Sequence, residues 1–208
     1  DEQYLSYNNA NQDAATQQQQ AEAALTNGAN VLVLDPVDSD AAAKIADLAK
    51  SKNVPVIAYD RLIKGSDGVT YYISFDNEQV GKLQGSALIT ALAGQVHPTI
   101  VMINGSPTDN NAILFKRGAH SVLDGKVLIA KEYDTPDWSP DKAQREMEQA
   151  LTTLNNRVDG VYAANDGMAG GAIAAMKAAG IQPLPAVTGQ DAELAAIQRI
   201  LAGEQYMT

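Results

Sequence analysis

The sequence predicts an α/β fold of two lobes, each with a parallel sheet flanked by helices. Three observations support this: short runs rich in β-branched residues recur along the chain, helical segments separate them, and polar residues directly follow almost every run. We expect strands at residues 31–34, 54–59, 71–75, 99–103, 127–130, 161–164 and 186–189.

The segments between these runs place their apolar residues on one helical face, as helices packed against a sheet do. The clearest faces are Ala41, Ile45, Leu48 and Ala49; Ala143, Met147, Ala150, Leu151 and Leu154; and Ala169, Ala172, Ile173 and Met176.

Local signals mark where these helices begin and end. Residues 38–40 offer oxygens for an N-cap, and Pro140 suits a first helical turn. Gly28 and Gly180 follow helical segments at positions where a left-handed C-cap is expected. The glutamines at 17–20 fall within a helical period, which predicts a solvated helix face.

A break in this rhythm at residues 94–98 follows a long helix expected at 77–92. It predicts an N-terminal lobe at residues 1–97 and a C-terminal lobe at 98–208.

Both ends of the sequence have the pattern of strands, at residues 3–7 and 205–208. We therefore expect the first βα unit of the N-terminal lobe and the last segments of the C-terminal lobe to lie outside this sequence.

Composition argues against several classes of function. The net charge is -10, from 25 acidic and 15 basic residues, and the basic residues are scattered, so no nucleic acid partner is expected. There is no cysteine, and His97 and His120 lack neighbours at metal-ligand spacing, so we expect no metal site. Gly167, Gly170 and Gly171 match no phosphate-binding loop. We therefore expect no cofactor. We interpret these glycines as residues that allow a helix and a strand to approach each other closely.

Polar side chains follow the predicted strands at their carboxyl ends, where open α/β sheets bind ligands. They are Asp35, Asp60, Arg61, Asp76, Asn77, Asn104, Asn165, Asp166, Gln190 and Asp191, with Asp109, Asn110, Asn111 and Trp138 in the loops beyond two of the strands.

Carboxylates, amides and a guanidinium suit a ligand with neighbouring hydroxyl groups, and an indole suits its C–H face. Two alternatives stand beside this interpretation. Asp and Asn after strands also cap the following helix, and we prefer that role for Asp35, Asp38, Asp76 and Asn77.

For Asp60 and Arg61, a structural ion pair competes with ligand contact, and we favour contact. Trp138 could belong to a core, but its polar neighbours at 137–141 favour an exposed role.

Several of these stretches, taken together, resemble periplasmic sugar-binding proteins of the ribose and galactose type, and among them the members that bind D-xylose. The resemblance extends over nearly the whole chain and is carried by residues 58–61, 72–78, 105–112, 165–166, 169–173 and 189–192.

The resemblance implies a periplasmic binding protein fold of type I, with the ligand in a cleft between the lobes. It also implies a periplasmic or cell-surface location, a xylose-like pentose as ligand, an ABC transporter permease as partner, a monomeric state and no enzymatic activity.

The resemblance further implies which residues contact the sugar. Asp109, Asn165 and Asp191 would lie in the second lobe and face Asp60 and Arg61. The family also uses a basic residue in the first βα unit and a lysine just past the position of Thr208, neither of which this sequence contains. The implied contacts are Asp60, Arg61, Asp109, Asn111, Trp138, Asn165 and Asp191.

Three other functions remain open. The fold also serves as the effector core of repressors of the lac type, although this sequence has no helix-turn-helix segment and no basic patch. A glycosidase would need one carboxyl group kept protonated, whereas carboxylates near amides and Arg61 should stay ionised. A sugar sensor that docks on a membrane histidine kinase fits the same residues.

Overall fold

The structure is a computed structural model that describes residues 4–208. The chain divides into two compact units, and each is described by itself. Unit 1 contains the residues up to Phe75 together with Thr108–Asn110, and unit 2 contains Asp76–Pro107 and Asn111–Thr208.

This division differs from the boundary predicted at residues 94–98. The long helix α3 (Asn77–Ala91) belongs to unit 2, where Leu88 and Leu92 enter the core and pack against Gly160 of a central strand. Conversely, a short loop from the middle of the sequence belongs to unit 1: Ser39 N donates to Thr108 O at 3.0 Å. The helix α3 belongs to unit 2 because its apolar side chains are buried in the core of that unit. The change in sequence pattern at residues 94–98 does not indicate this burial.

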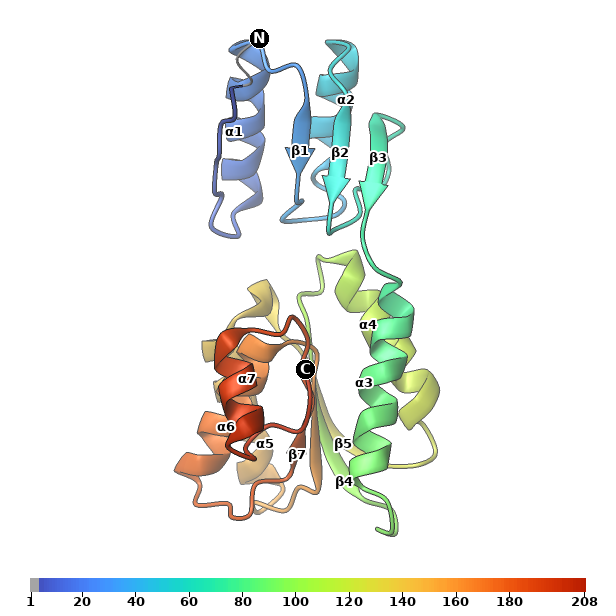
Figure 1. Ribbon diagram of the computed structural model, residues 1–208, viewed down its shortest axis with the longest axis vertical. Coiled ribbons are helices and arrows are strands. Elements are labelled where there is room, and N and C mark those ends of the chain that lie inside the picture. The colour runs from blue at the N-terminus through green and yellow to red at the C-terminus, as the bar shows by residue number, and fades with distance from the viewer. Residues whose placement is uncertain (1–3) are drawn as a thin grey trace. The chain divides into compact units, whose positions relative to one another are not determined.

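Unit 1 is a three-stranded parallel sheet in the order β1-β2-β3 with two helices (Figure 1). Its elements are α1 (Ala14–Thr26), β1 (Leu32–Leu34), α2 (Ala43–Ser51), β2 (Val56–Tyr59) and β3 (Val69–Ile73).

The core of unit 1 lies on one face of this sheet. Inward residues of β1 and β2, including Leu34, Val56 and Ala58, pack with both helices through residues such as Leu25 and Ile45. The other face carries exposed apolar side chains. These are Val33, Tyr59, Tyr71 and Ile73.

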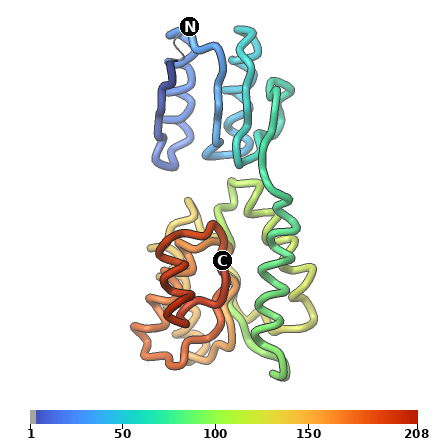
Figure 2. Tube along the Cα trace, in the orientation of Figure 1, coloured from blue at the N-terminus to red at the C-terminus, as the bar shows by residue number. Residues whose placement is uncertain are grey.

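Unit 2 is a four-stranded parallel sheet in the order β5-β4-β6-β7. In Figure 1, α3 and α4 cover one face and α5 and α6 the other; the chain trace in Figure 2 follows the same path. Besides α3, its elements are β4 (Thr99–Asn104), α4 (Asn110–Leu123), β5 (Leu128–Asp134), the 3-10 turn η1 (Pro136–Trp138), α5 (Pro140–Thr153), β6 (Gly160–Ala163), α6 (Asp166–Ala178), β7 (Ala186–Val187) and α7 (Leu194–Leu201).

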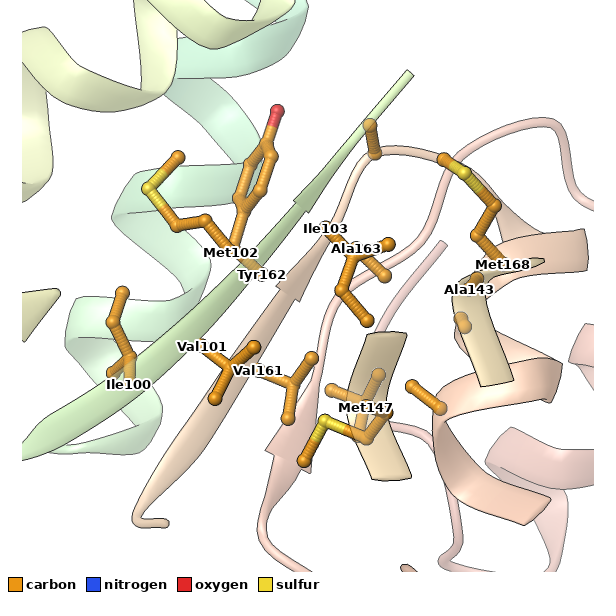
Figure 3. Close-up of a cluster of buried hydrophobic side chains, with 14 of the residues drawn as sticks. Ile100, Val101, Met102, Ile103, Ala143, Met147, Val161, Tyr162, Ala163 and Met168 are labelled. Carbon is orange, nitrogen blue, oxygen red and sulfur yellow. The ribbon is translucent and has the colours of Figure 1, made fainter. Parts of the chain in front are cut away.

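The central strands of unit 2 are apolar on both faces because helices cover both. In Figure 3, Met102 and Tyr162 point to one side of the sheet, and Ile103 and Ala163 point to the other, toward Met168. All five side chains are fully buried. This is the continuous hydrophobic pattern expected of a parallel strand between two helical layers.

A buried amide joins α3 to the carboxyl ends of two strands. Gln84 is 1% exposed, and its Nε2 donates to Ala164 O at 3.0 Å and to Gly189 O at 2.9 Å. The hydroxyl of Tyr162 donates to Gln84 Oε1 at 2.7 Å. All polar atoms of this side chain are thus satisfied, which a buried amide requires.

Glycines allow the helices of unit 2 to approach one another closely. A Cβ atom at Gly81 of α3 would overlap the carbonyl of Phe115 in α4, and one at Gly118 of α4 would overlap the carbonyl of Glu78 in α3. Gly171 of α6 lies in the same way against α5. The close approach predicted at this glycine is confirmed, but the neighbouring element is a helix and not a strand.

All seven predicted strands are confirmed, with ends that shift by a few residues. The strands predicted at the two ends are wrong for the residues that the structure describes. Residues 4–7 form no ladder, and Gln3 lies outside the described range. Residues 205–208 form no strand either, although Tyr206 N donates to Val187 O at 3.0 Å, because one such bond does not make a ladder.

The helix signals also have clear outcomes. Gly28 and Gly180 have φ values of 86° and 73°, and Pro140 opens α5, all as predicted. The glutamines at 17–20 lie in α1, but Gln17 and Gln20 hold other segments through hydrogen bonds and so do more than face solvent. Within residues 4–208, no helix is both long and apolar enough to cross a membrane.

Candidate ligand-binding site

A buried ion pair organises the loop after β2 in unit 1. Arg61 Nε lies 2.9 Å from Asp109 Oδ2, with the Asp109 side chain 1% exposed and that of Arg61 14% exposed. Asp109 reaches Arg61 because the loop that contains it is fixed to unit 1, where Asn110 N donates to the Ser39 hydroxyl at 3.1 Å. Arg61 therefore does form a structural ion pair, the alternative weighed against ligand contact, and its partner is Asp109.

Asp35, at the end of β1, lies beside this pair and caps no helix. Its Oδ1 is 3.6 Å from Arg61 Nε, so the capping role predicted for it is wrong. Partial burial raises the pKa of Asp35 to about 6, where Arg61 opposes the rise and Asp60 and Asp109 add to it. Its side chain is still 54% exposed, so this carboxyl group is both perturbed and accessible.

Neighbouring strands explain why Asp35 and Arg61 meet. β1 pairs with β2 in parallel, so the residues that follow the two strands emerge at the same edge of the sheet. Gln17 of α1 fixes the first of these loops: its Nε2 donates to Asp35 O at 2.8 Å and its Oε1 accepts from Val37 N at 2.9 Å.

Asp60 occupies a tight turn between β2 and Arg61. Its φ is 63°, in the left-handed region that non-glycine residues seldom adopt, and its N–H donates to Ile73 O at 2.8 Å. Such backbone conformations cluster at functional sites and persist when neighbouring bonds hold them. The turn places two charged side chains in succession at the edge of the sheet.

Of the other capping predictions, the one for Asp76 is confirmed: it accepts from Gln79 N at 3.0 Å and caps α3. The one for Asp38 is wrong, because Asp38 accepts from Ala41 N at 2.7 Å in a turn before α2, and the N-cap of α2 is Ala42, which has no side-chain capping bond. Asn77 is different: it is the first helical residue, is buried, and donates to Asn111 Oδ1 at 3.0 Å. It therefore links the first turns of α3 and α4.

In unit 2, the four predicted contact residues follow four adjacent strands. Asn111, Trp138, Asn165 and Asp191 come after β4, β5, β6 and β7, and parallel strands present these loops at one edge of the sheet. The side chain of Asn165 also caps α6, since its Oδ1 accepts from Met168 N at 3.0 Å. Its amide nitrogen is the group with the chemistry to donate to a ligand.

Trp138 lies in η1 and is half-buried. Its indole covers Gly105, where any Cβ atom would overlap the ring, and it meets Phe115 edge-on at 6.1 Å between ring centroids. Both predicted alternatives hold in part, because the ring packs on the core of unit 2 and also keeps some exposure.

Asp109 does not lie where the sequence placed it. It was expected in the second lobe with Asn165 and Asp191, but its ion pair with Arg61 assigns it to unit 1. The spacing of Asp109 from the end of β4 could not reveal this, because the loop leaves unit 2 for only three residues.

Other polar groups near the strand ends serve the structure. Asn104 is buried and donates to Glu132 Oε1 at 3.0 Å. His97 is exposed, and His120 lies between Asp124 at 2.8 Å and Glu132 at 3.0 Å. Residues 4–208 hold no group of three or more His, Asp or Glu side chains placed to bind a metal ion.

Comparison with known proteins identifies relatives along the full sequence. A model of the family described as "Periplasmic binding protein domain" matches residues 1–208. The chain is 42% identical over 204 residues to the D-xylose-binding periplasmic protein of Escherichia coli, and that match covers 96% of the chain and 61% of the relative. It is 41% identical over 219 residues to a multiple sugar-binding periplasmic protein of Azospirillum brasilense, with coverage of 96% and 61%.

Among solved structures, an ABC transporter solute-binding protein from Clostridium phytofermentans with bound β-D-glucose superposes with a TM-score of 0.85. It is 34% identical, and the match covers 93% of this chain and 65% of that one. The chain thus spans 61% of the length of the curated relatives it matches. With its two parallel α/β units and a family match along its whole length, the chain belongs to the periplasmic binding protein domain family.

Proposed function

We propose that this chain is the ligand-binding body of an extracytoplasmic solute-binding protein that captures a monosaccharide, a xylose-like pentose, for an ABC transporter permease. The observation that carries the proposal is the set of polar side chains at the carboxyl edges of both sheets. It combines acceptors, amides, one guanidinium and one indole, and it occurs in a chain 42% identical to a D-xylose-binding protein.

The proposed division of labour follows from the chemistry of the groups. Arg61 would donate to sugar oxygens, and its orientation is fixed by Asp109 at 2.9 Å. Asp60 and Asp191 would accept from hydroxyl groups, and the amides of Asn111 and Asn165 would complement them. These groups bind but do not react, and the chain would act by capture and release.

Trp138 would cover the C–H face of the sugar. Its ring is already supported by Phe115 and by the backbone at Gly105, so little side-chain freedom would be lost on binding. A ring held in this way offers apolar area at a low entropic cost.

Titration calorimetry on the protein produced from its complete reading frame tests the proposal. Xylose should bind with a dissociation constant near micromolar, which is about -8 kcal/mol or roughly -0.8 kcal/mol per heavy atom of a ten-atom sugar. Ribose, galactose and glucose should bind more weakly. Absence of heat with every pentose and hexose would refute the proposal, and hydrolysis of a nitrophenyl xyloside above the blank would favour an enzyme.

An Asp191→Ala variant tests the site. Losing a charge-assisted acceptor should weaken xylose binding by about 2 kcal/mol, or roughly 30-fold, with little effect on the melting temperature. Asp124→Ala is the matched control, because it removes an exposed carboxylate of unit 2 at the end of α4, away from the carboxyl edge of the sheet. Equal affinity in both variants would remove Asp191 from the site.

A further inference from the structure

The loop between β7 and α7 holds Asp191 in an unusual backbone conformation. Asp191 has a φ of 100° and Ala192 a φ of 52°, so two consecutive non-glycine residues lie in the left-handed region. Both residues are exposed, so burial of their side chains does not explain the conformation. Hydrogen bonds to this loop must supply the constraint.

Two residues outside the predicted contact set supply these bonds. Asp166 N donates to Gln190 O at 3.0 Å, and Asp166 Oδ2 accepts from Glu193 N at 3.0 Å. The Thr208 hydroxyl accepts from Ala192 N at 3.0 Å and donates to Asp166 Oδ2 at 2.6 Å. The two residues after Asp191 are therefore tied to one carboxylate–hydroxyl pair, and the residue before it is tied to the backbone of Asp166.

Asp166 is itself fixed and cannot reach a ligand. It is fully buried, its Oδ1 accepts from Gln205 Nε2 at 2.8 Å, and its carbonyl oxygen accepts from Arg199 at 2.8 Å. Gln205 Oε1 in turn accepts from Arg199 Nε at 2.9 Å. A Cβ atom at residue 189 would overlap Asp166 Oδ1 and Gln205 Nε2, which explains the glycine at that position.

We propose that Asp166 and Thr208 are positioning residues that hold the Asp191 carboxylate ready for the ligand. The inference rests on the proposed function, since Asp191 is taken there as a sugar contact. A loop held in its bound form before the ligand arrives loses less entropy on binding. The affinity for sugar therefore depends on two residues that do not touch it.

The decisive comparison is between Thr208→Val and Thr208→Ser. Valine matches threonine in shape but removes both hydroxyl bonds, whereas serine keeps them. In the valine variant, amide hydrogen exchange of a peptide covering residues 190–194 should speed up without ligand. Xylose affinity should fall by about tenfold. The serine variant should restore both values, and the melting temperature should change little in either.

A double-mutant cycle separates positioning from a general structural effect. If Thr208 acts through Asp191, Thr208→Val should weaken xylose binding in the parent but not in an Asp191→Ala background. An equal loss in both backgrounds would overturn the proposal, and so would a valine variant with the exchange and affinity of the parent. If the parent binds no sugar, the proposed function fails, while the exchange comparison still decides whether Thr208 holds the loop.

Discussion

Removing Asp109 should destabilise unit 1 even when no ligand is present. Its carboxylate is the close partner of the Arg61 guanidinium at 2.9 Å, and the two side chains are 1% and 14% exposed. An Asp109→Ala variant leaves a largely buried positive charge without this partner. Breaking a buried pair in this way costs about 3–5 kcal/mol.

Two features of the structure reduce that figure. Arg61 keeps a second carboxylate, Asp35, at 3.6 Å, and a weak bond from its guanidinium to Pro36 O at 3.4 Å. We therefore expect a loss of about 2 kcal/mol, which lowers the melting temperature by roughly 4–8 °C in a protein of this size. Asp109→Asn, which still offers an acceptor, should lie between parent and alanine.

Thermal melts followed by circular dichroism measure the effect, with Asp67→Ala as the control. Asp67 pairs with Lys50 at 2.6 Å, but their side chains are 83% and 53% exposed, so its loss should barely change the melting temperature. If Asp109→Ala melts like Asp67→Ala while sugar affinity falls, Asp109 serves the ligand alone and the structural argument is wrong.

Two further predictions concern titration and fluorescence. The folded state raises the pKa of Asp35 from 3.8 to about 6, so the protonated form favours folding, and stability should fall as the pH rises between these values. Asp35→Asn should abolish that fall and match the parent near pH 4 in thermal melts; an unchanged profile would contradict it. The single indole at Trp138 should change its emission when xylose is added, with Trp138→Phe reducing affinity modestly and Trp138→Ala by about 2–3 kcal/mol. Unchanged xylose affinity in Trp138→Ala would mean that the ring serves only the fold.

Strand positions could be predicted from the sequence because most strands are short, apolar and followed by a polar residue. The central strands at 99–104 and 160–163 are buried on both faces, so their hydrophobic runs are unbroken. The two-unit division was harder to predict. Unit 1 ends at Phe75, unit 2 begins just before α3, and residues 108–110 return to unit 1. These features depend on tertiary contacts, which leave no periodic pattern in the sequence.

The site residues show the same contrast. A position directly after a strand was enough to predict Asp60, Asn165 and Asp191 as site residues, because parallel strands end at the same edge of a sheet, where ligands bind. The same rule cannot tell a cap from an ion-pair partner, which is why Asp35 was assigned to the wrong role. The support given by Thr208 depends on a bond from Ala192 to a residue 16 positions further along the chain, and no local sequence pattern indicates such a bond.

The bonds of Gln84 also set an order of events during synthesis. Its amide in α3 must wait for acceptors that follow 80 and 105 residues later, at Ala164 and Gly189. At a translation rate of about 5–20 residues per second, the second acceptor is made roughly 5–20 s after the glutamine. Until then the amide of Gln84 lacks one of its two backbone acceptors. Burying α3 on the ribosome before that point would leave a polar group unsatisfied and is therefore disfavoured. The helix α3 is among the first parts of unit 2 to be made, but its hydrogen bonds are complete only when the segment after the last strand, β7, has been made.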